Sequence, residues 1–228
     1  MNNKLYIIGI GFRPIDKRAR GVILDAVHLL VNDRLLEVFR GYDEYEKVKE
    51  RIKVINNVDE TMEFMKAEVQ KGSGSIVLIA EGDPMFFGIG RRVIDEFGKD
   101  GVEIYPDLSS MQVAFSRIKE TWSDAFLISL HGGPDPEKRR RLPYEIKDIP
   151  YLLQSHNKVA ILTDKENSPS AIAKGLLNPS VFRLQPSALK IYVCERLGYP
   201  DERLYEGSPD EIAGMSFSTP NVVIIMRH

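Results

Sequence analysis

The stretch best suited to hold a small ligand is EGDPMFFGIG, at positions 81–90, which directly follows the apolar run SIVLIA. Its glycines let the backbone approach a ligand, so that N–H groups can point at polar atoms without a Cβ in the way. Phe86 and Phe87 offer an apolar wall for a planar ring. In the structural alternative, Asp83 and Pro84 form a turn, Asp83 caps the following helix, and the phenylalanines are core. The sequence leaves both interpretations open.

Three side chains are candidates for proton transfer in such a site: Asp83, His131 and Asp164. His131 opens the long loop HGGPDPEKRRRLP, where a histidine hydrogen-bonded to backbone is the simpler interpretation. Asp164 follows an apolar strand and is equally suited to cap a helix. Cys194 lies within an apolar strand pattern, which favours a small core residue over a nucleophile.

The glycine spacing argues against the common nucleotide fingerprints. The first loop reads Gly9-Ile10-Gly11-Phe12-Arg13-Pro14, so a proline stands where the dinucleotide fingerprint needs its third glycine. The 81–90 stretch also lacks the spacing of a phosphate-binding GxxxxGK[ST] loop. Glu103 lies about 20 residues after Gly82, where a ribose-binding acid is expected, so a nicotinamide oxidoreductase stays an alternative. A nucleotide-binding module without turnover is another.

Composition narrows the class of partner. The 228 residues include 31 lysines and arginines against 33 aspartates and glutamates, a net charge of −2, so no nucleic-acid partner is expected. One cysteine and four histidines form no metal-ligand pattern, so no metal is expected. The opening MNNKLYIIGIG is too short for a signal or a membrane span, which predicts a soluble, cytoplasmic protein without a membrane partner.

Strand and helix patterns alternate along the first half of the chain. Strands are predicted at 4–11, 34–39, 53–57, 75–80 and 102–106. Helices are predicted from apolar spacing at 19–31, 42–52, 58–69 and 90–97. This alternation favours a mainly parallel α/β sheet, in which the first loop and the 81–90 loop face one crevice at the carboxyl ends of the strands.

The second half begins with a helix at Ser109, which places the lobe boundary between 1–108 and 109–228. Strands are predicted at 125–130, 158–164, 188–198, 202–207 and 221–228. Another helix is predicted after Ser168, which caps it, with Pro169 at its first position. Three β-rich segments close together favour a partly antiparallel second sheet.

Several segments, in order along nearly the whole chain, resemble the tetrapyrrole (corrin/porphyrin) methylase family. They are GIG at 9–11, EGDPMFFGIG, PDLSSMQVAFSRI, FLISLHG, KVAILTD with SPSAIA, ERLGYPDERLYEG, and STPNVVIIM. Within that family, the serine pair followed by MQVAF, the segment SLHG and the residues around 197–202 are most similar to members that methylate carbon 5 of a precorrin.

The resemblance implies a two-lobed α/β enzyme with a mainly parallel N-terminal sheet, a mixed C-terminal sheet and S-adenosylmethionine in the cleft between the lobes. It implies C-methylation of a (cobalt-)precorrin in cobalamin biosynthesis by a homodimer. Another tetrapyrrole position, a diphthamide precursor or ribosomal RNA are alternative targets, and the near-neutral charge disfavours RNA. Some relatives continue into a decarboxylating methyltransferase domain; this chain ends at His228, so that activity is expected from a separate protein.

The resemblance also implies which positions contact the cofactor. They are Gly82, Asp83, Pro84, Met85, Phe86, Phe87, Ser109, Ser110, Thr163, Leu197 and Val222. Methyl transfer from a sulfonium has a neutral leaving group, so positioning can supply most of the catalysis without a covalent nucleophile.

Candidate substrate-binding residues are Gly11, Arg13, Arg139, Arg140 and Arg141. A polycarboxylate substrate suits the basic run at 138–141 as an electrostatic clamp, although a solvated charge run is the simpler interpretation. Two departures from the family pattern leave the role of the first loop open. Phe12-Arg13-Pro14 replaces the second half of the usual Gly-x-Gly-Pro-Gly-Asp, and Asp107 stands where a glycine commonly precedes the serine pair.

Overall fold

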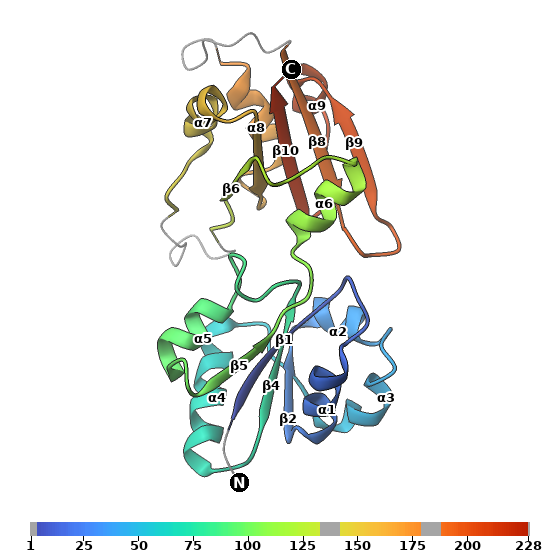
Figure 1. The fold of residues 1–228 in the computed structure, drawn as a ribbon, viewed down its shortest axis with the longest axis vertical. Helices are drawn as coiled ribbons and strands as arrows, with labels where there is room; N and C mark the ends of the chain where they lie inside the picture. Colours follow the sequence, from blue (N-terminus) through green and yellow to red (C-terminus); the bar gives the residue numbers. More distant parts are fainter. Residues whose placement is uncertain (1–3, 133–141, 179–187, 228) are drawn as a thin grey trace. The chain divides into compact units, whose positions relative to one another are not determined.

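The computed structural model describes residues 4–132, 142–178 and 188–227, which form two compact units that divide after Ser109. Each unit is built around one five-stranded sheet with helices on its faces (Figure 1). The α/β class is therefore confirmed, with one sheet in each half of the chain.

The sheet of the N-terminal unit is wholly parallel. Its strands are β1 (Leu5–Ile10), β2 (His28–Val31), β3 (Ile52–Val54), β4 (Ile76–Glu81) and β5 (Val102–Tyr105). They are ordered β3-β2-β4-β1-β5, so β1 lies between β4 and β5. The register sets Ile10 beside Glu81 and Ile8 beside Tyr105, so the loops that follow these three strands leave the same edge of the sheet.

Helices cover both faces of this sheet, as a parallel sheet requires. One face packs against α1 (Lys17–Asp25), α2 (Asp33–Phe39) and α3 (Tyr45–Val48), which is followed by the 3-10 turn η1 (Lys49–Arg51). The other face packs against α4 (Val58–Lys71) and α5 (Gly90–Phe97) (Figure 1). The two buried clusters use alternate residues of the strands, since successive side chains point to opposite faces.

Two predicted elements in this unit are wrong. The helix predicted at 19–31 ends at Asp25, and 28–31 forms β2, because a strand buried on both faces presents an apolar run that continues the helical spacing. The strand predicted at 34–39 is the helix α2. Its N-cap Asn32 accepts a hydrogen bond from the Leu35 N–H at 2.8 Å, and Asp33 lies in its first turn.

The sheet of the C-terminal unit is mixed, as predicted. Its strands are β6 (Ala125–Ser129), β7 (Lys158–Leu162), β8 (Leu189–Glu195), β9 (Arg203–Gly207) and β10 (Asn221–Arg227). In the order β6-β7-β10-β8-β9, only β6 and β7 are parallel neighbours, and the other pairs are antiparallel.

Among the described residues, four helices pack on this second sheet. One face is covered by α7 (Ile149–Ser155), which follows the 3-10 turn η3 (Ile146–Asp148), and by α8 (Pro169–Leu176) and α9 (Pro209–Ala213). Helix α6 (Ser110–Ile118) lies against β10, and its buried residues are outside the cluster that α7, α8 and α9 share with the sheet (Figure 1). Ser168 caps α8, with Pro169 at its first position, as predicted.

Candidate functional site

Main-chain hydrogen bonds join the three loops at the carboxyl edge of the N-terminal sheet. The Gly82 N–H donates to the Ile10 carbonyl at 2.9 Å, and the Asp107 N–H donates to the Gly82 carbonyl at 3.2 Å. The loops after β1, β4 and β5 are therefore fixed to one another. This edge is where open α/β sheets bind ligands, and both glycine loops lie there as predicted. The crevice that they are predicted to share stays a prediction.

Two glycines make this junction possible. A Cβ on Gly9 would stand 1.8 Å from the Gly82 carbonyl oxygen, so no side chain fits at that position. Gly82 has φ +62°, and a Cβ on it would stand 2.8 Å from the Leu108 carbonyl oxygen. Because both polar groups of Gly82 bond within the protein, its N–H does not point at a ligand as the sequence had suggested.

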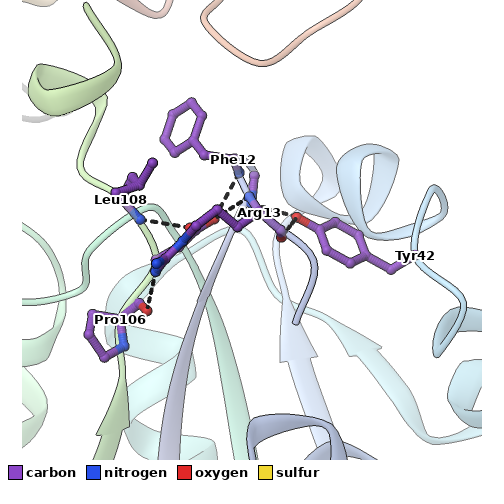
Figure 2. Close-up of polar contacts among 7 residues, drawn as sticks. Phe12, Arg13, Tyr42, Pro106 and Leu108 are labelled. Atoms are coloured by element: carbon purple, nitrogen blue, oxygen red, sulfur yellow. Dashed lines mark hydrogen bonds and ion pairs between the residues drawn. The ribbon is translucent and has the colours of Figure 1, made fainter. Parts of the chain in front are cut away.

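The Asp107 carboxylate ties the first loop to the end of β5 (Figure 2). Its Oδ2 accepts the N–H groups of Phe12 at 2.8 Å and Arg13 at 3.2 Å. Its Oδ1 accepts the Arg13 Nε–H at 2.7 Å and the Leu108 N–H at 2.7 Å. Only 4% of the Asp107 side chain is exposed, against 52% for Arg13. The two departures from the family pattern are thus bonded to each other.

Tyr42, which no local pattern in the sequence marks as a site residue, holds the same loop from the other side. Its hydroxyl accepts the Gly11 N–H at 2.8 Å and donates to the Arg13 carbonyl at 3.1 Å (Figure 2). Burial raises the pKa of Tyr42 above its usual value, and the nearby Asp107 charge acts in the same direction. The hydroxyl therefore stays protonated and able to donate.

The loop after β4 is not the simple helix cap that one interpretation proposed. The Asp83 carboxylate accepts the Met85 N–H at 2.8 Å, whereas α5 begins only at Gly90 and has no side-chain cap. Phe87 has φ 55° and is 40% exposed, and Met85 is 50% exposed, so neither is core. The rings of Phe86 and Phe87 pack edge to face, with their centroids 4.8 Å apart. Apolar side chains therefore stand open at this edge.

The other two glycines of that loop serve its own turn. A Cβ on Gly88 would stand 2.5 Å from the Pro84 carbonyl oxygen, and one on Gly90 would stand 2.8 Å from the same atom. The absence of a side chain at these two positions is thus required by the loop itself, and their approach to a ligand stays a prediction. Both glycines leave room for the loop's own backbone.

In the C-terminal unit, the structure gathers the predicted cofactor contacts Thr163, Leu197 and Val222 at one end of the sheet. Thr163 follows β7, Leu197 follows β8, and Val222 lies at the start of β10 beside Leu162 and Cys194. The Thr163 hydroxyl donates to the Asn221 carbonyl at 2.9 Å. Leu197 and Val222 are 5% and 3% exposed. Asn221, also buried, is a member of this group that the sequence analysis missed.

Asp164 lies on the loop after β7 and His131 on the loop after β6, and a hydrogen bond joins these two loops. The Asp164 carboxylate accepts the N–H groups of Gly132 at 3.0 Å, Glu166 at 3.0 Å and Asn167 at 2.8 Å. Asp164 therefore ties these two loops together, while Ser168 caps α8. His131 is exposed, and its backbone N–H donates to the Ser129 hydroxyl at 3.3 Å.

The remaining predicted positions fall as follows. Ser109 is buried, and Ser110 is the first residue of α6. Gly11 has φ +125°, with open space where a Cβ would stand. Arg139, Arg140 and Arg141 lie outside the described residues.

Glu103, the candidate ribose ligand of the oxidoreductase alternative, is already paired. It lies inside β5, where its carboxylate bonds with the Lys4 ammonium and the Tyr105 hydroxyl. The hydrogen bond from Lys4, followed by that from Tyr105, lowers the pKa of Glu103 below its usual value. A carboxylate held in mid-strand does not stand at the carboxyl edge where a ribose would bind.

Within the described part of the chain, no helix is long and apolar enough to cross a membrane. The same residues contain no group of three or more His, Cys, Asp or Glu side chains that could hold a metal ion.

Comparison with known proteins gives one consistent family. The family model for Tetrapyrrole (Corrin/Porphyrin) Methylases matches residues 4–213. The chain is 30% identical over 229 residues to a probable cobalt-precorrin-7 C(5)-methyltransferase from Methanocaldococcus jannaschii, covering 96% of each chain.

Solved structures have the same fold. A precorrin-6Y methylase of cobalamin biosynthesis from Archaeoglobus fulgidus superimposes with a TM-score of 0.70 at 21% identity, over 100% of this chain and 98% of the other. A uroporphyrin-III C-methyltransferase from Thermus thermophilus, complexed with S-adenosylhomocysteine, gives 0.64 at 20% identity, over 98% and 92%. On the match of the family model to most of its length, this chain belongs to the tetrapyrrole (corrin/porphyrin) methylase family.

Proposed function

We propose that this protein is an S-adenosylmethionine-dependent methyltransferase that acts on carbon 5 of a cobalt-precorrin in cobalamin biosynthesis. The observation that carries the proposal is the 30% identity, over 96% of both chains, to a protein named as a probable cobalt-precorrin-7 C(5)-methyltransferase. The fold shared with a precorrin-6Y methylase supports it.

The proposed cofactor contacts are Gly82–Phe87 and Ser109 in the N-terminal unit, and Ser110, Thr163, Leu197 and Val222 in the C-terminal unit. S-adenosylmethionine, when bound, supplies a methyl group on a positively charged sulfur. The exposed apolar side chains of Met85 and Phe87 fit such a ligand, because charge on the sulfur disperses during transfer and needs no buried counter-ion.

The chain's own part in the reaction is to position the reactants. In-line transfer to an electron-rich ring carbon needs alignment above all, and a rigid frame supplies it. The main-chain bonds among Ile10, Gly82 and Asp107 give that frame to the N-terminal unit. Asp83 and Asp164 accept backbone N–H groups, so we assign them to loop structure rather than to proton transfer. We propose no single catalytic base.

The first test is isothermal titration with S-adenosylhomocysteine, with NADH and ATP as controls. Binding of S-adenosylhomocysteine alone supports the proposal, whereas preference for NADH or ATP overturns it. The second test uses methyl-labelled S-adenosylmethionine and a cobalt-precorrin that lacks the carbon-5 methyl group. A label at carbon 5, assigned by NMR, supports the proposed position. A label at another carbon, or methylation only of a non-tetrapyrrole acceptor, favours a different member of the family.

The assembly is a further part of the proposal. We propose a cytoplasmic homodimer. Light scattering coupled to size exclusion gives the mass in solution, and a monomer mass near 25.9 kDa would contradict the dimer.

A further inference from the structure

The first loop presents a partly used guanidinium. Arg13 Nε donates to Asp107, and Nη2 donates to the Pro106 carbonyl at 3.2 Å. A guanidinium carries five N–H donors, and the described residues take no bond from the Nη1 end of this one. With half of the side chain exposed, that end is open to an incoming acceptor.

Asp107 fixes the direction of this guanidinium before any ligand arrives. Its two oxygens accept hydrogen bonds from four N–H donors, three of which belong to backbone, so the carboxylate is held in place and holds Arg13 in turn. A free arginine side chain has many rotamers, and one that is already held loses less conformational entropy on binding. The arrangement is that of a preorganised carboxylate receptor.

A pocket beside Arg13 has the size of a substituent rather than of a macrocycle. Its volume is about 280 Å³, at the low end for a ligand pocket. Apolar walls come from Ile8, Ile15 and Tyr105, and charged ones from Arg13, Asp107 and Asp16. Asp16 uses its Oδ1 as the N-cap of α1, bonded to the N–H groups of Arg18 and Ala19. The apolar walls fit an alkyl chain, and among these lining residues the Arg13 guanidinium is the group that can bind a carboxylate at its end.

We infer that Asp107 is a positioning residue, which holds Arg13 so that the open end of its guanidinium binds a peripheral carboxylate of the substrate. The inference rests on the proposed function for the identity of the substrate as a polycarboxylated tetrapyrrole. It assigns a role to the first loop, whose sequence departs from the family pattern. Arg13 and Asp107 share this role in substrate binding, although they are far apart in the chain.

The test compares wild type with Arg13→Gln, Asp107→Asn and the double variant. In Asp107→Asn, the amide oxygen keeps the Phe12 and Arg13 N–H groups when it takes the place of Oδ2. The N–H₂ then faces the Arg13 Nε–H and the Leu108 N–H, so the arginine is released. The matched control is Arg91→Gln, which removes the same charge from an exposed residue of α5. The probes are dicyanocobyrinic acid, a corrin with free peripheral carboxylates, and S-adenosylhomocysteine, with thermal unfolding to verify the fold.

The expected result is that each single variant weakens binding of the corrin acid about tenfold, as loss of a charge-assisted hydrogen bond does. The double variant should bind no worse than the weaker single variant, because Asp107 acts through Arg13. Affinity for S-adenosylhomocysteine should change less than about twofold in Arg13→Gln, because Arg13 is not among the proposed cofactor contacts.

Unchanged corrin affinity in either single variant would overturn the inference, and so would additive losses in the double variant. The proposed function fails separately, if wild type binds no S-adenosylhomocysteine. Corrin binding in the same four proteins still decides the role of Asp107 in that case, because the carboxylate probe is measured directly.

Discussion

The carbonyl of Gly82 occupies the space that a side chain on Gly9 would need, since a Cβ there would stand 1.8 Å from the oxygen. The two strands β1 and β4 therefore meet at a point where only backbone fits. That point lies directly below the loops proposed to bind cofactor and substrate.

We predict that Gly9→Ala destabilises the protein by about 3 kcal/mol or more, because the methyl group must force the two strand ends apart. Gly21→Ala is the matched control, since Gly21 lies inside α1 and a Cβ there meets nothing within 4 Å. It should stabilise by up to about 1 kcal/mol through helix propensity. Urea unfolding followed by far-UV circular dichroism measures both, and equal effects would contradict the steric explanation.

Phe87→Gly separates ligand binding from stability. The residue has φ 55°, which costs a non-glycine residue about 1–2 kcal/mol, so its replacement relieves strain while it loses the contact with Phe86. We expect stability to change by less than about 1 kcal/mol, and affinity for S-adenosylhomocysteine to fall about tenfold as apolar contact is lost. Tyr151→Ala, at an exposed aromatic residue of α7, should change neither quantity. Wild-type affinity in Phe87→Gly would remove this side chain from the proposed site.

Glu68 predicts a specific dependence of stability on acid pH. Hydrogen bonds from Lys71 and then Ser73 lower its pKa from 4.5 to about 2. A lowered pKa stabilises the folded protein above pH 4.5, and the contribution disappears as the pH falls to about 2. Between these values, wild type should lose stability relative to Glu68→Gln.

The free energy of unfolding, measured from about pH 5 to pH 2, tests this relation. Glu63→Gln, at an exposed position of the same helix, serves as the control. Parallel curves for wild type and Glu68→Gln would show that the carboxylate does not hold its charge in the folded state.

Cys194 is predicted to be chemically inert. Burial, and to a smaller extent the charge of Glu202, raises the pKa of its thiol to about 12, so almost no thiolate exists at neutral pH. Thiol reagents should label the native protein far more slowly than the urea-unfolded protein. Cys194→Ala should keep its methyl-transfer rate, and loss of activity in a correctly folded variant would point to a chemical role that we do not assign.

Most elements were predictable because their signals are local. The helix at Gly90–Phe97 and the Ser168 cap with Pro169 follow from periodicity and capping chemistry. The α2 helix carried such a signal in Asn32 and Asp33, which the apolar run at 34–39 obscured. The strand at 28–31 carried none, because its buried residues repeat the spacing of the preceding helix.

The site was predictable only in part. Loops that bear its residues were identified, but the bonds of Asp107 to Phe12 and Arg13 span more than 90 residues and leave no local pattern. The same is true of Tyr42, whose role depends on the fold bringing it to Gly11. The sequence allows the Gly82 N–H to point at a ligand, because a sequence does not show that this group already donates to the Ile10 carbonyl.

The bonds that hold the three loops together run between main-chain atoms of Ile10, Gly82 and Asp107. Such bonds depend on backbone position and are indifferent to most changes at neighbouring side chains. Mutations at exposed positions such as Arg13 or Met85 can therefore accumulate without dismantling the frame. Single substitutions at such positions can therefore change which macrocycle substituents the protein binds, while the scaffold stays folded.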